Sequence, residues 1–438
     1  MSQRINIVGA GLAGCEAAYQ VAKRGVQVNL YECKPVAMSP AHHLETFAEL
    51  VCSNSLRADN IENASGLLKH EMRKLDSLIM RAADACAVPA GGALAVDRNK
   101  FTEYVTNEIK NNPNITVINE MVDTIPEDGS TWIIASGPLT MGELPEYIKG
   151  LIGDDSLYFY DAAAPIVDAD SIDMDIVYCA DRYGKGDGDY LNCPMSKDEY
   201  EAFRNALLEA EQVELHSFEN MIHFEGCMPI EALAKRGEDT MRFGPLKPVG
   251  LTNPRTGRED YACVQLRKEN KAGTMYNLVG FQTNLKWPEQ KRVFGMIPGL
   301  KDAAYLRYGV MHRNTFIKSP GKLNATYRLK ADKNIYFAGQ ITGVEGYIES
   351  TSSGLVAGIN AAREVLGQEP VVFPATTVIG ALAHHASDYA GKDFQPMKAN
   401  FGIVDTEQFP KVRRQSKMER YQLIAQNSLD IIQQIATE

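Results

Sequence analysis

The chain has 438 residues, which is long enough for two domains with sizeable cores. Its composition, 45% hydrophobic and 23% charged, is typical of a globular protein. It contains no apolar run of about 18 residues or more, so we expect no membrane span. A strand pattern begins at Arg4, which predicts a cytoplasmic protein without a signal peptide. The eight cysteines form no CxxC pair and no zinc-type spacing with histidines, so we expect reduced thiols and no metal site.

The formal net charge of −11 argues against a nucleic-acid partner, but the charges are unevenly distributed. Residues 235–330 contain 19 Lys and Arg against 7 Asp and Glu, a balance of +12. This segregation indicates a surface for a polyanion. The alternative is a solvated face whose charges are balanced by acids from elsewhere in the fold.

A nucleotide-binding pattern occupies the first 32 residues. An apolar strand over 5–8 runs into a glycine loop and an alanine-rich helix, and a second apolar strand over 26–30 precedes an acid. In this pattern the first glycine makes a tight turn, the second lets the backbone approach a pyrophosphate, and the third lets the helix pack on the sheet. The acid is placed to accept a hydrogen bond from a ribose hydroxyl. The predicted dinucleotide-binding residues are Gly9, Ala10, Gly11, Leu12, Ala13, Gly14 and Glu32.

Strand patterns at 115–122 and 131–137 continue the alternation of strand and helix, which predicts a doubly wound parallel sheet. Beyond residue 160 the pattern changes. Turn-rich segments separate short strand-like runs at 261–266 and 276–281. A helix is predicted over 196–212, because a serine is followed three residues later by a glutamate. These features predict an inserted, mostly β-containing domain.

The nucleotide pattern returns at residues 334–363, where an apolar strand stops at Gly339-Gln340 and a glycine-rich loop leads into a helix from about 351. Such a unit would bring a helix N-terminus to the far side of the same dinucleotide, as long, extended FAD requires. The alternative is an ordinary strand-to-helix turn. A final helix is predicted over 411–436.

We therefore predict an α/β fold, with a Rossmann-like FAD-binding domain in two parts and a mixed, β-containing inserted domain. The predicted limits are 1–160 and 315–438 for the FAD-binding parts and 161–314 for the insertion.

Blocks along nearly the whole chain resemble the folate- and FAD-dependent tRNA uracil-5-methyltransferase family, TrmFO. They include PAHHLETFAELVCSNSLR at 40–57, FEGCMPIE at 224–231, RFGPLKPVGLTNPRTG at 242–257 and FQPMKANFG at 394–402. The related GidA/MnmG flavoproteins share the first glycines and an AGQ-type late motif, but this chain is too short for their extra C-terminal helical domain.

The resemblance implies methylation of C5 of a uridine in the T-loop of tRNA. The carbon would come from 5,10-methylenetetrahydrofolate, and the electrons from NAD(P)H through FAD. The alternatives are the same chemistry on ribosomal RNA, or a GidA-like flavin oxidoreductase that transfers no methyl group. Nothing in the sequence indicates the oligomeric state.

Two cysteines in polar loops, Cys52 and Cys227, fit the chemistry that the resemblance implies. A thiolate that adds to C6 of uracil makes C5 nucleophilic, and a base must then remove the C5 proton. We assign Cys227 as the nucleophile and Cys52 as the base, with the reverse assignment as the alternative. A nearby guanidinium would favour the thiolate form.

Five other residues are weaker candidates. Trp287 would wall the pterin or the flavin entrance, with a buried core tryptophan as the alternative. His312 and Arg313 would contact folate or phosphate. The pair His42-His43 would line the flavin site near Cys52, or cap a loop.

Overall fold

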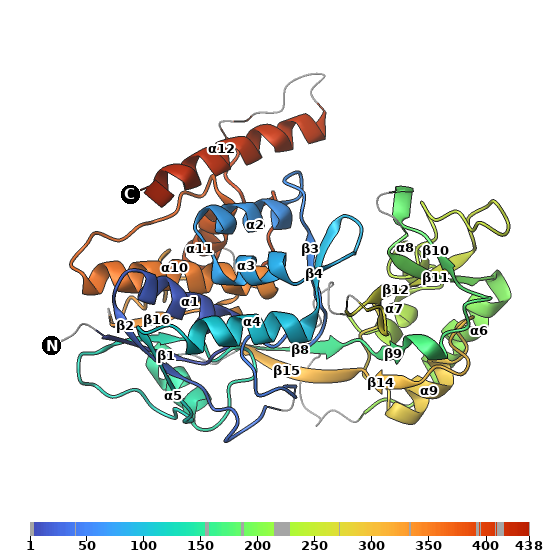
Figure 1. Cartoon of the computed structure of the whole chain (residues 1–438), viewed down its shortest axis with the longest axis horizontal. Helices are drawn as coiled ribbons and strands as arrows, with labels where there is room; N and C mark the ends of the chain where they lie inside the picture. Colours follow the sequence, from blue (N-terminus) through green and yellow to red (C-terminus); the bar gives the residue numbers. More distant parts are fainter. Residues whose placement is uncertain are drawn as a thin grey trace.

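Two lobes, joined by a long two-stranded ribbon, make up the protein (Figure 1). The computed structural model describes residues 4–39, 41–153, 157–184, 188–213, 228–270, 272–332, 334–390, 394, 396–407, 409 and 416–437. For 157–163 and 310–315 it describes the backbone alone.

A five-stranded parallel sheet forms the base of the first lobe. Its order is β16-β7-β1-β2-β6, so the N-terminal strand lies at the centre, between the second strand and strands from the middle and late parts of the chain. Central strands of parallel sheets are buried on both faces, and Ile5 and Ile7 are accordingly fully buried. The bounds are β1 Arg4–Val8, β2 Gln27–Tyr31, β6 Ile115–Ile118, β7 Thr131–Ile134 and β16 Ile335–Phe337.

Helices α1 and α10 cross in close contact over this sheet. The contact is possible because glycines replace larger residues at the crossing: a Cβ on Gly354 would lie 2.2 Å from the Ala13 carbonyl oxygen, and one on Gly358 would lie 2.7 Å from that of Ala17. The helices of this lobe are α1 Leu12–Lys23, α2 Ala64–Lys74, α3 Leu78–Ala85, α4 Arg98–Lys110, α5 Leu144–Ile152, α10 Tyr347–Val365, α11 Val378–Asp388 and α12 Lys417–Thr437. The last of them, α12, lies outermost, against α2 (Figure 1).

A small antiparallel sheet stands at the edge of the first lobe that faces the second (Figure 1). It has the order β3-β5-β4, with β3 Ser55–Ala58, β4 Ala87–Val88 and β5 Ala93–Val96. The loop that carries Cys52 leads directly into β3. This sheet therefore places the loop between the two lobes.

The second lobe is built on a six-stranded sheet of order β10-β11-β12-β13-β9-β14, whose pairs are antiparallel. One face of β11 and β12 packs in an apolar core with α6, α7 and α9. The strands are β9 Ile166–Asp168, β10 Tyr178–Cys179, β11 Tyr190–Met195, β12 Ala262–Lys268, β13 Met275–Leu278 and β14 Tyr305–Arg307. The helices are α6 Lys197–Glu209, α7 Ile230–Arg236, α8 Thr240–Phe243 and α9 Trp287–Phe294.

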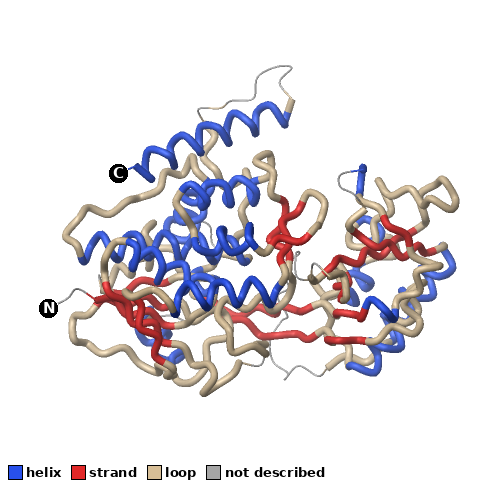
Figure 2. The backbone as a smooth tube through the Cα atoms, in the orientation of Figure 1, coloured by secondary structure: helices blue, strands red, loops and turns tan. Residues whose placement is uncertain are grey.

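The ribbon between the lobes consists of β8 Leu157–Ala163 and β15 Val310–Phe316, which pair antiparallel. Each strand runs almost directly into the second sheet, β8 into β9 and β15 from β14, as the red strands of Figure 2 show. Ala164 and Arg307 lie where the ribbon meets the second sheet.

The predicted α/β class, with a Rossmann-like FAD-binding fold and a β-containing insertion, is confirmed. The domain limits themselves stay a prediction. Most strands and helices lie where the patterns place them, including α6, whose Ser196 and Glu199 form the expected capping box. The predicted strands at 115–122 and 131–137 end earlier, at Ile118 and Ile134.

Two helices begin elsewhere than predicted. Helix α10 begins at Tyr347, not 351, so its serine-rich first turns are helical. In these turns the Thr351 hydroxyl donates to the Tyr347 carbonyl and the Ser353 hydroxyl to the Ser350 carbonyl, both at 2.7 Å. Helix α12 begins at Lys417, and residues 411–415 of the predicted helix lie outside the described residues.

Candidate functional site

The glycine loop after β1 opens on a large pocket at the carboxyl edge of the parallel sheet. Gly9 has a φ of 96°, and a Cβ there would meet the Ala135 carbonyl oxygen at 2.6 Å. A Cβ on Gly14 would lie 1.8 Å from the Gly9 carbonyl oxygen, whereas one on Gly11 would meet no atom within 4 Å. The three glycines therefore divide as the pattern predicts: two permit close packing, and Gly11 leaves its backbone open to a ligand.

Glu32 lies beside this loop and also lines the pocket. Its carboxylate accepts hydrogen bonds from the backbone amides of Ala10, at 2.7 Å, and Lys34, at 3.0 Å. Each carboxylate oxygen has a further lone pair. The acid thus braces the glycine loop while keeping acceptor capacity for a hydroxyl.

The late glycine loop reaches the same pocket from β16. Gly339, with a φ of 89°, donates its amide to Ser353 Oγ at 2.7 Å, and Gly339, Gln340, Tyr347 and Ser350 all line the pocket. The N-termini of α1 and α10 thus open on one pocket, and each offers unpaired amides to anions. These residues fit a long dinucleotide such as FAD, because its diphosphate and its ring system could contact the two glycine loops that line the pocket.

Cys52 lies on the wall of this pocket, against Tyr347 from the first turn of α10. The Tyr347 hydroxyl accepts a hydrogen bond from the Cys52 amide at 2.8 Å and lies 2.9 Å from Cys52 Sγ. Burial, followed by the Coulomb effect of Cys52, raises the pKa of Tyr347 well above its ordinary value, so the hydroxyl stays protonated. The thiol therefore has a fixed, neutral neighbour on the side of α10.

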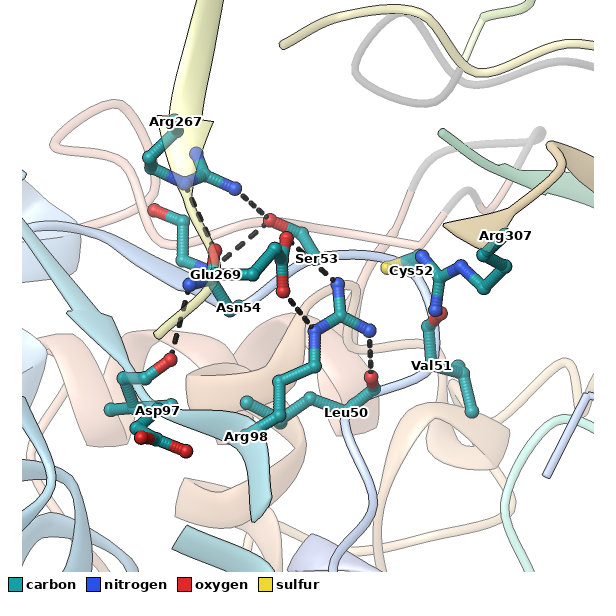
Figure 3. A network of polar contacts seen from close by, with 12 residues as sticks. Leu50, Val51, Cys52, Ser53, Asn54, Asp97, Arg98, Arg267, Glu269 and Arg307 are labelled. Carbon is teal, nitrogen blue, oxygen red and sulfur yellow. Dashed lines mark hydrogen bonds and ion pairs between the residues drawn. The ribbon is translucent and has the colours of Figure 1, made fainter. Parts of the chain in front are cut away.

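Three buried or half-buried arginines hold the rest of the Cys52 loop (Figure 3). Arg98 donates to the Leu50 carbonyl at 2.6 Å, and Arg307 donates to the Val51 carbonyl at 2.9 Å. Arg267 donates to Ser53 Oγ at 2.7 Å. These contacts fix the backbone before Cys52 and the side chain after it.

Glu269 pairs with Arg98 at 2.6 Å, and their side chains are 1% and 14% exposed. Burial lowers the pKa of Arg98, but the attraction of Glu269, together with smaller effects of Tyr347 and Cys52, outweighs burial and raises this pKa above its ordinary value. Asn54, next to the loop, donates to the carbonyls of Val96 and Lys268. The Cys52 loop is thus tied to both lobes.

The sequence patterns did not single out these partners. Arg57, the arginine nearest to Cys52 in the sequence, pairs instead with Glu349 at 3.3 Å. Arg98, Arg267 and Arg307 come from three distant segments. Because the contacts join residues far apart in the chain, no local spacing could have revealed them.

The structure does not bring the remaining candidates into one site. Cys227 lies outside the described residues. His312 and Arg313 lie on β15, paired in register with Asp161 and Tyr160 of β8, and their side chains are not described. Trp287 begins α9, is 60% exposed, and stacks on Tyr308 with ring centroids 5.4 Å apart. Trp287 is therefore no core residue, and it is not among the residues that line the pocket.

The two neighbouring histidines have different surroundings. His42 lines the pocket and hydrogen-bonds to Ser39 through Nδ1, and burial lowers its pKa. The backbone amide of His43 instead donates to Glu49, which ties a loop. Within the described ranges, no group of three or more His, Cys, Asp or Glu is placed to hold a metal ion, and no helix is long and apolar enough to cross a membrane.

Comparison with known proteins gives a consistent result. The family described as Glucose inhibited division protein A matches residues 4–369. The chain is 60% identical over 438 residues, all of both chains, to the methylenetetrahydrofolate–tRNA-(uracil-5-)-methyltransferase TrmFO of Acetivibrio thermocellus. It is 59% identical over 434 residues, 99% of both chains, to that of Bacillus subtilis. Among solved structures, GidA of Aquifex aeolicus matches with a TM-score of 0.70 at 16% identity, over 100% of this chain and 74% of that one, which shows a shared fold.

Proposed function

The chain belongs to the TrmFO family of methylenetetrahydrofolate–tRNA-(uracil-5-)-methyltransferases, and from that premise we propose that it methylates C5 of a uridine in the T-loop of tRNA. The carbon comes from 5,10-methylenetetrahydrofolate, and the electrons from NAD(P)H. The observation that carries the proposal is a thiol, Cys52, on the wall of a pocket built for a dinucleotide.

The residues that would hold FAD are those of the two glycine loops. The amides of Gly11 to Ala13, at the N-terminus of α1, would bind the diphosphate, Glu32 would bind a ribose hydroxyl, and Gly339 and Gln340 would bind from the opposite wall. When bound, the flavin supplies the redox chemistry that links NAD(P)H to the one-carbon unit. Tyr347, from the first turn of α10, is partly buried and lines the same pocket.

Two thiols divide the work on the base. Cys227 as thiolate adds to C6 of uracil, which makes C5 nucleophilic toward the one-carbon unit. Cys52 then takes the C5 proton at Sγ, and the C6–S bond breaks when the product forms. Support for this part lies in the fixed position of Cys52 beside Tyr347. The reverse assignment predicts the same products but exchanges the phenotypes of the two variants.

Trp287 stays a candidate stacking surface for the pterin. Its exposed ring, backed by Tyr308, offers a rigid aromatic face. A Trp287→Ala variant should then bind folate more weakly while keeping its flavin. Unchanged folate affinity would remove Trp287 from the site.

The proposal is tested by incubating the flavin-loaded protein with tRNA, methylenetetrahydrofolate and NAD(P)H and mapping the methylated nucleotide. 5-Methyluridine in the T-loop supports it, whereas methylation of ribosomal RNA alone or consumption of NAD(P)H without methylation refutes it. A colourless protein that cannot be reconstituted with FAD would refute the cofactor assignment.

The two cysteines are separated with tRNA that contains 5-fluorouridine, which traps the C6 adduct. We expect Cys227→Ala to abolish the covalent complex and Cys52→Ala to retain it. The opposite pattern would make Cys52 the nucleophile.

A further inference from the structure

Arg307 is a half-buried cation without an ion-pair partner among the described residues. It lies where β14 ends and the ribbon begins, and it donates to two backbone carbonyls, Val51 at 2.9 Å and Ala164 at 3.3 Å. Its Nε is buried and has no hydrogen-bond partner in the described part of the chain. Burial, followed by repulsion from Arg98, lowers the pKa of Arg307 to about 10, which still leaves it charged at neutral pH. An unpaired buried charge is costly unless an anion compensates for it.

The neighbouring arginines already have partners. Arg98 is neutralised by Glu269, and Arg267 is bound by the side chains of Ser53 and Asn54. Among the described residues Glu269 forms its ion pair with Arg98 and not with Arg307, and its Coulomb attraction also favours the charged form of Arg307. Figure 3 shows the guanidinium of Arg307 against the Val51–Cys52 segment, on the side of the thiol.

Cys52 is the group beside Arg307 that can become an anion. Other charged or titratable groups near the thiol include Arg98 from α4 of the first lobe, Glu269 from the second lobe and Tyr347 from α10. Glu49, on the same pocket wall, binds the amide of His43. The charged form of Arg307 is stabilised by the negative charge of Glu269, then by that of Tyr347 and then by that of a Cys52 thiolate. This attraction is mutual, because a Coulomb interaction stabilises both members of a pair.

We propose that Arg307 is the counter-charge of the Cys52 thiolate, a positioning residue that holds the Cys52 loop through Val51 and keeps the thiol ionised for proton transfer. The inference rests on the proposed role of Cys52 in catalysis. It gives the junction of sheet and ribbon a function: the second lobe supplies the charge that a thiol in the first lobe requires. When the thiol ionises, its proton passes to solvent and the negative charge stays on Sγ.

The test is the pH dependence of Cys52 alkylation by iodoacetamide, in protein that carries its flavin but no RNA or folate. Thiolate attack forms the C–S bond and releases iodide, so the rate reports the thiolate fraction. Peptide mass spectrometry separates Cys52 from Cys179, an exposed cysteine that serves as the reference in the same molecule. We expect Arg307→Met to slow alkylation of Cys52 about tenfold at pH 7, the effect of removing one close opposite charge.

Two further variants keep the test decisive. Arg307→Lys retains the charge and should restore most of the parental rate. Glu269→Gln removes the acid that neutralises Arg98, so alkylation of Cys52 should become faster, the opposite of the effect of Arg307→Met. This variant keeps the test usable even if Arg307→Met does not fold. Arg267→Met is the matched control, because that buried arginine grips the same loop but its Coulomb partners do not include Cys52.

Equal alkylation profiles for the parent, Arg307→Met and Glu269→Gln would overturn the inference. So would a loss of rate in Arg267→Met as large as in Arg307→Met, since that would reflect loop geometry alone. The assay contains no RNA, so it separates this inference from the proposed function. If Arg307→Met shifts the pH profile of alkylation but the parent protein does not methylate tRNA, the role of Arg307 is supported and the proposed function is rejected.

Discussion

A single hydroxyl holds the Cys52 loop to α10. Tyr347 Oη accepts from the amides of Cys52, at 2.8 Å, and Ser53, at 3.3 Å. Tyr347→Phe removes the hydroxyl that accepts both hydrogen bonds, which should lower the free energy of unfolding by about 1–3 kcal/mol. Denaturant unfolding measures the loss. Tyr327→Phe is the control, because the buried Tyr327 hydroxyl has no hydrogen-bond partner in the described structure and its removal should be neutral or stabilising. Equal losses in the two variants would contradict the role of Tyr347.

At the scale of elements, different glycines at the start of α1 serve packing and ligand binding: Gly14 allows close packing, and Gly11 leaves room for the ligand. A Cβ on Gly14 would lie 1.8 Å from the Gly9 carbonyl oxygen, so Gly14→Ala must displace backbone and should cost about 1–3 kcal/mol of stability. The Gly11 Cβ position is open, and its φ of −74° suits any residue. Gly11→Ala should therefore fold normally but bind FAD at least about tenfold more weakly, a loss of about 1.4 kcal/mol. Thermal unfolding of the apoprotein and flavin titration measure the two effects; a stable Gly14→Ala protein would refute the packing argument.

Three helices of the first lobe meet at one buried carboxylate. Glu71 of α2 accepts from the amides of Val378 and Ile379 at the start of α11, both at 2.8 Å, and from Ser428 of α12. Burial raises the pKa of Glu71 from 4.5 to about 7. The folded state therefore binds a proton more tightly than the unfolded state, and the contribution of Glu71 to stability declines as pH rises from about 4.5 through 7.

Comparison of the parent with Glu71→Gln checks this pH dependence. The difference between their free energies of unfolding should fall as pH rises across this window, by the order of 3 kcal/mol for a shift of this size. Denaturant unfolding between pH 5 and about 8 covers the relevant change. A difference that is constant with pH, or that grows, would show that Glu71 titrates near its ordinary value in the folded protein.

At the scale of the whole molecule, the charge is divided: residues 235–330 carry +12 in a chain of net charge −11. Several basic residues of this segment have paired side chains, including Arg242 with Asp239 and Arg292 with Glu289. Lys235 and Arg236, at the end of α7, are exposed. Binding of tRNA through such residues should weaken steeply with salt, because each phosphate contact contributes a slope of about −0.7 to −0.9 to log affinity against log salt.

Replacement of both Lys235 and Arg236 with Glu should reduce this slope by about 1–2. Lys110→Glu, at the exposed end of α4 in the other lobe, is the matched control and should leave the slope unchanged. Filter binding or anisotropy across a salt series measures both. A flat salt response in the parent would contradict a tRNA-binding role for this segment.

The sequence by itself determined what depends on neighbours in the chain. The strand–glycine–helix unit at residues 4–32 predicted the first strand, the helix after it and the dinucleotide pocket, because these elements follow one another directly in the chain. The capping box at Ser196 likewise predicted α6. The resemblance along the whole chain indicated the family and named Cys52.

Only the tertiary structure decided what surrounds Cys52. Tyr347 lies 295 residues away in the chain, and Arg267 and Arg307 come from a separate sheet. Their roles arise because the ribbon and the small antiparallel sheet bring the second lobe against one loop of the first. Buried charges and hydrogen bonds of this kind act over a few ångströms in space, whatever their separation in sequence, so the fold alone assembles them.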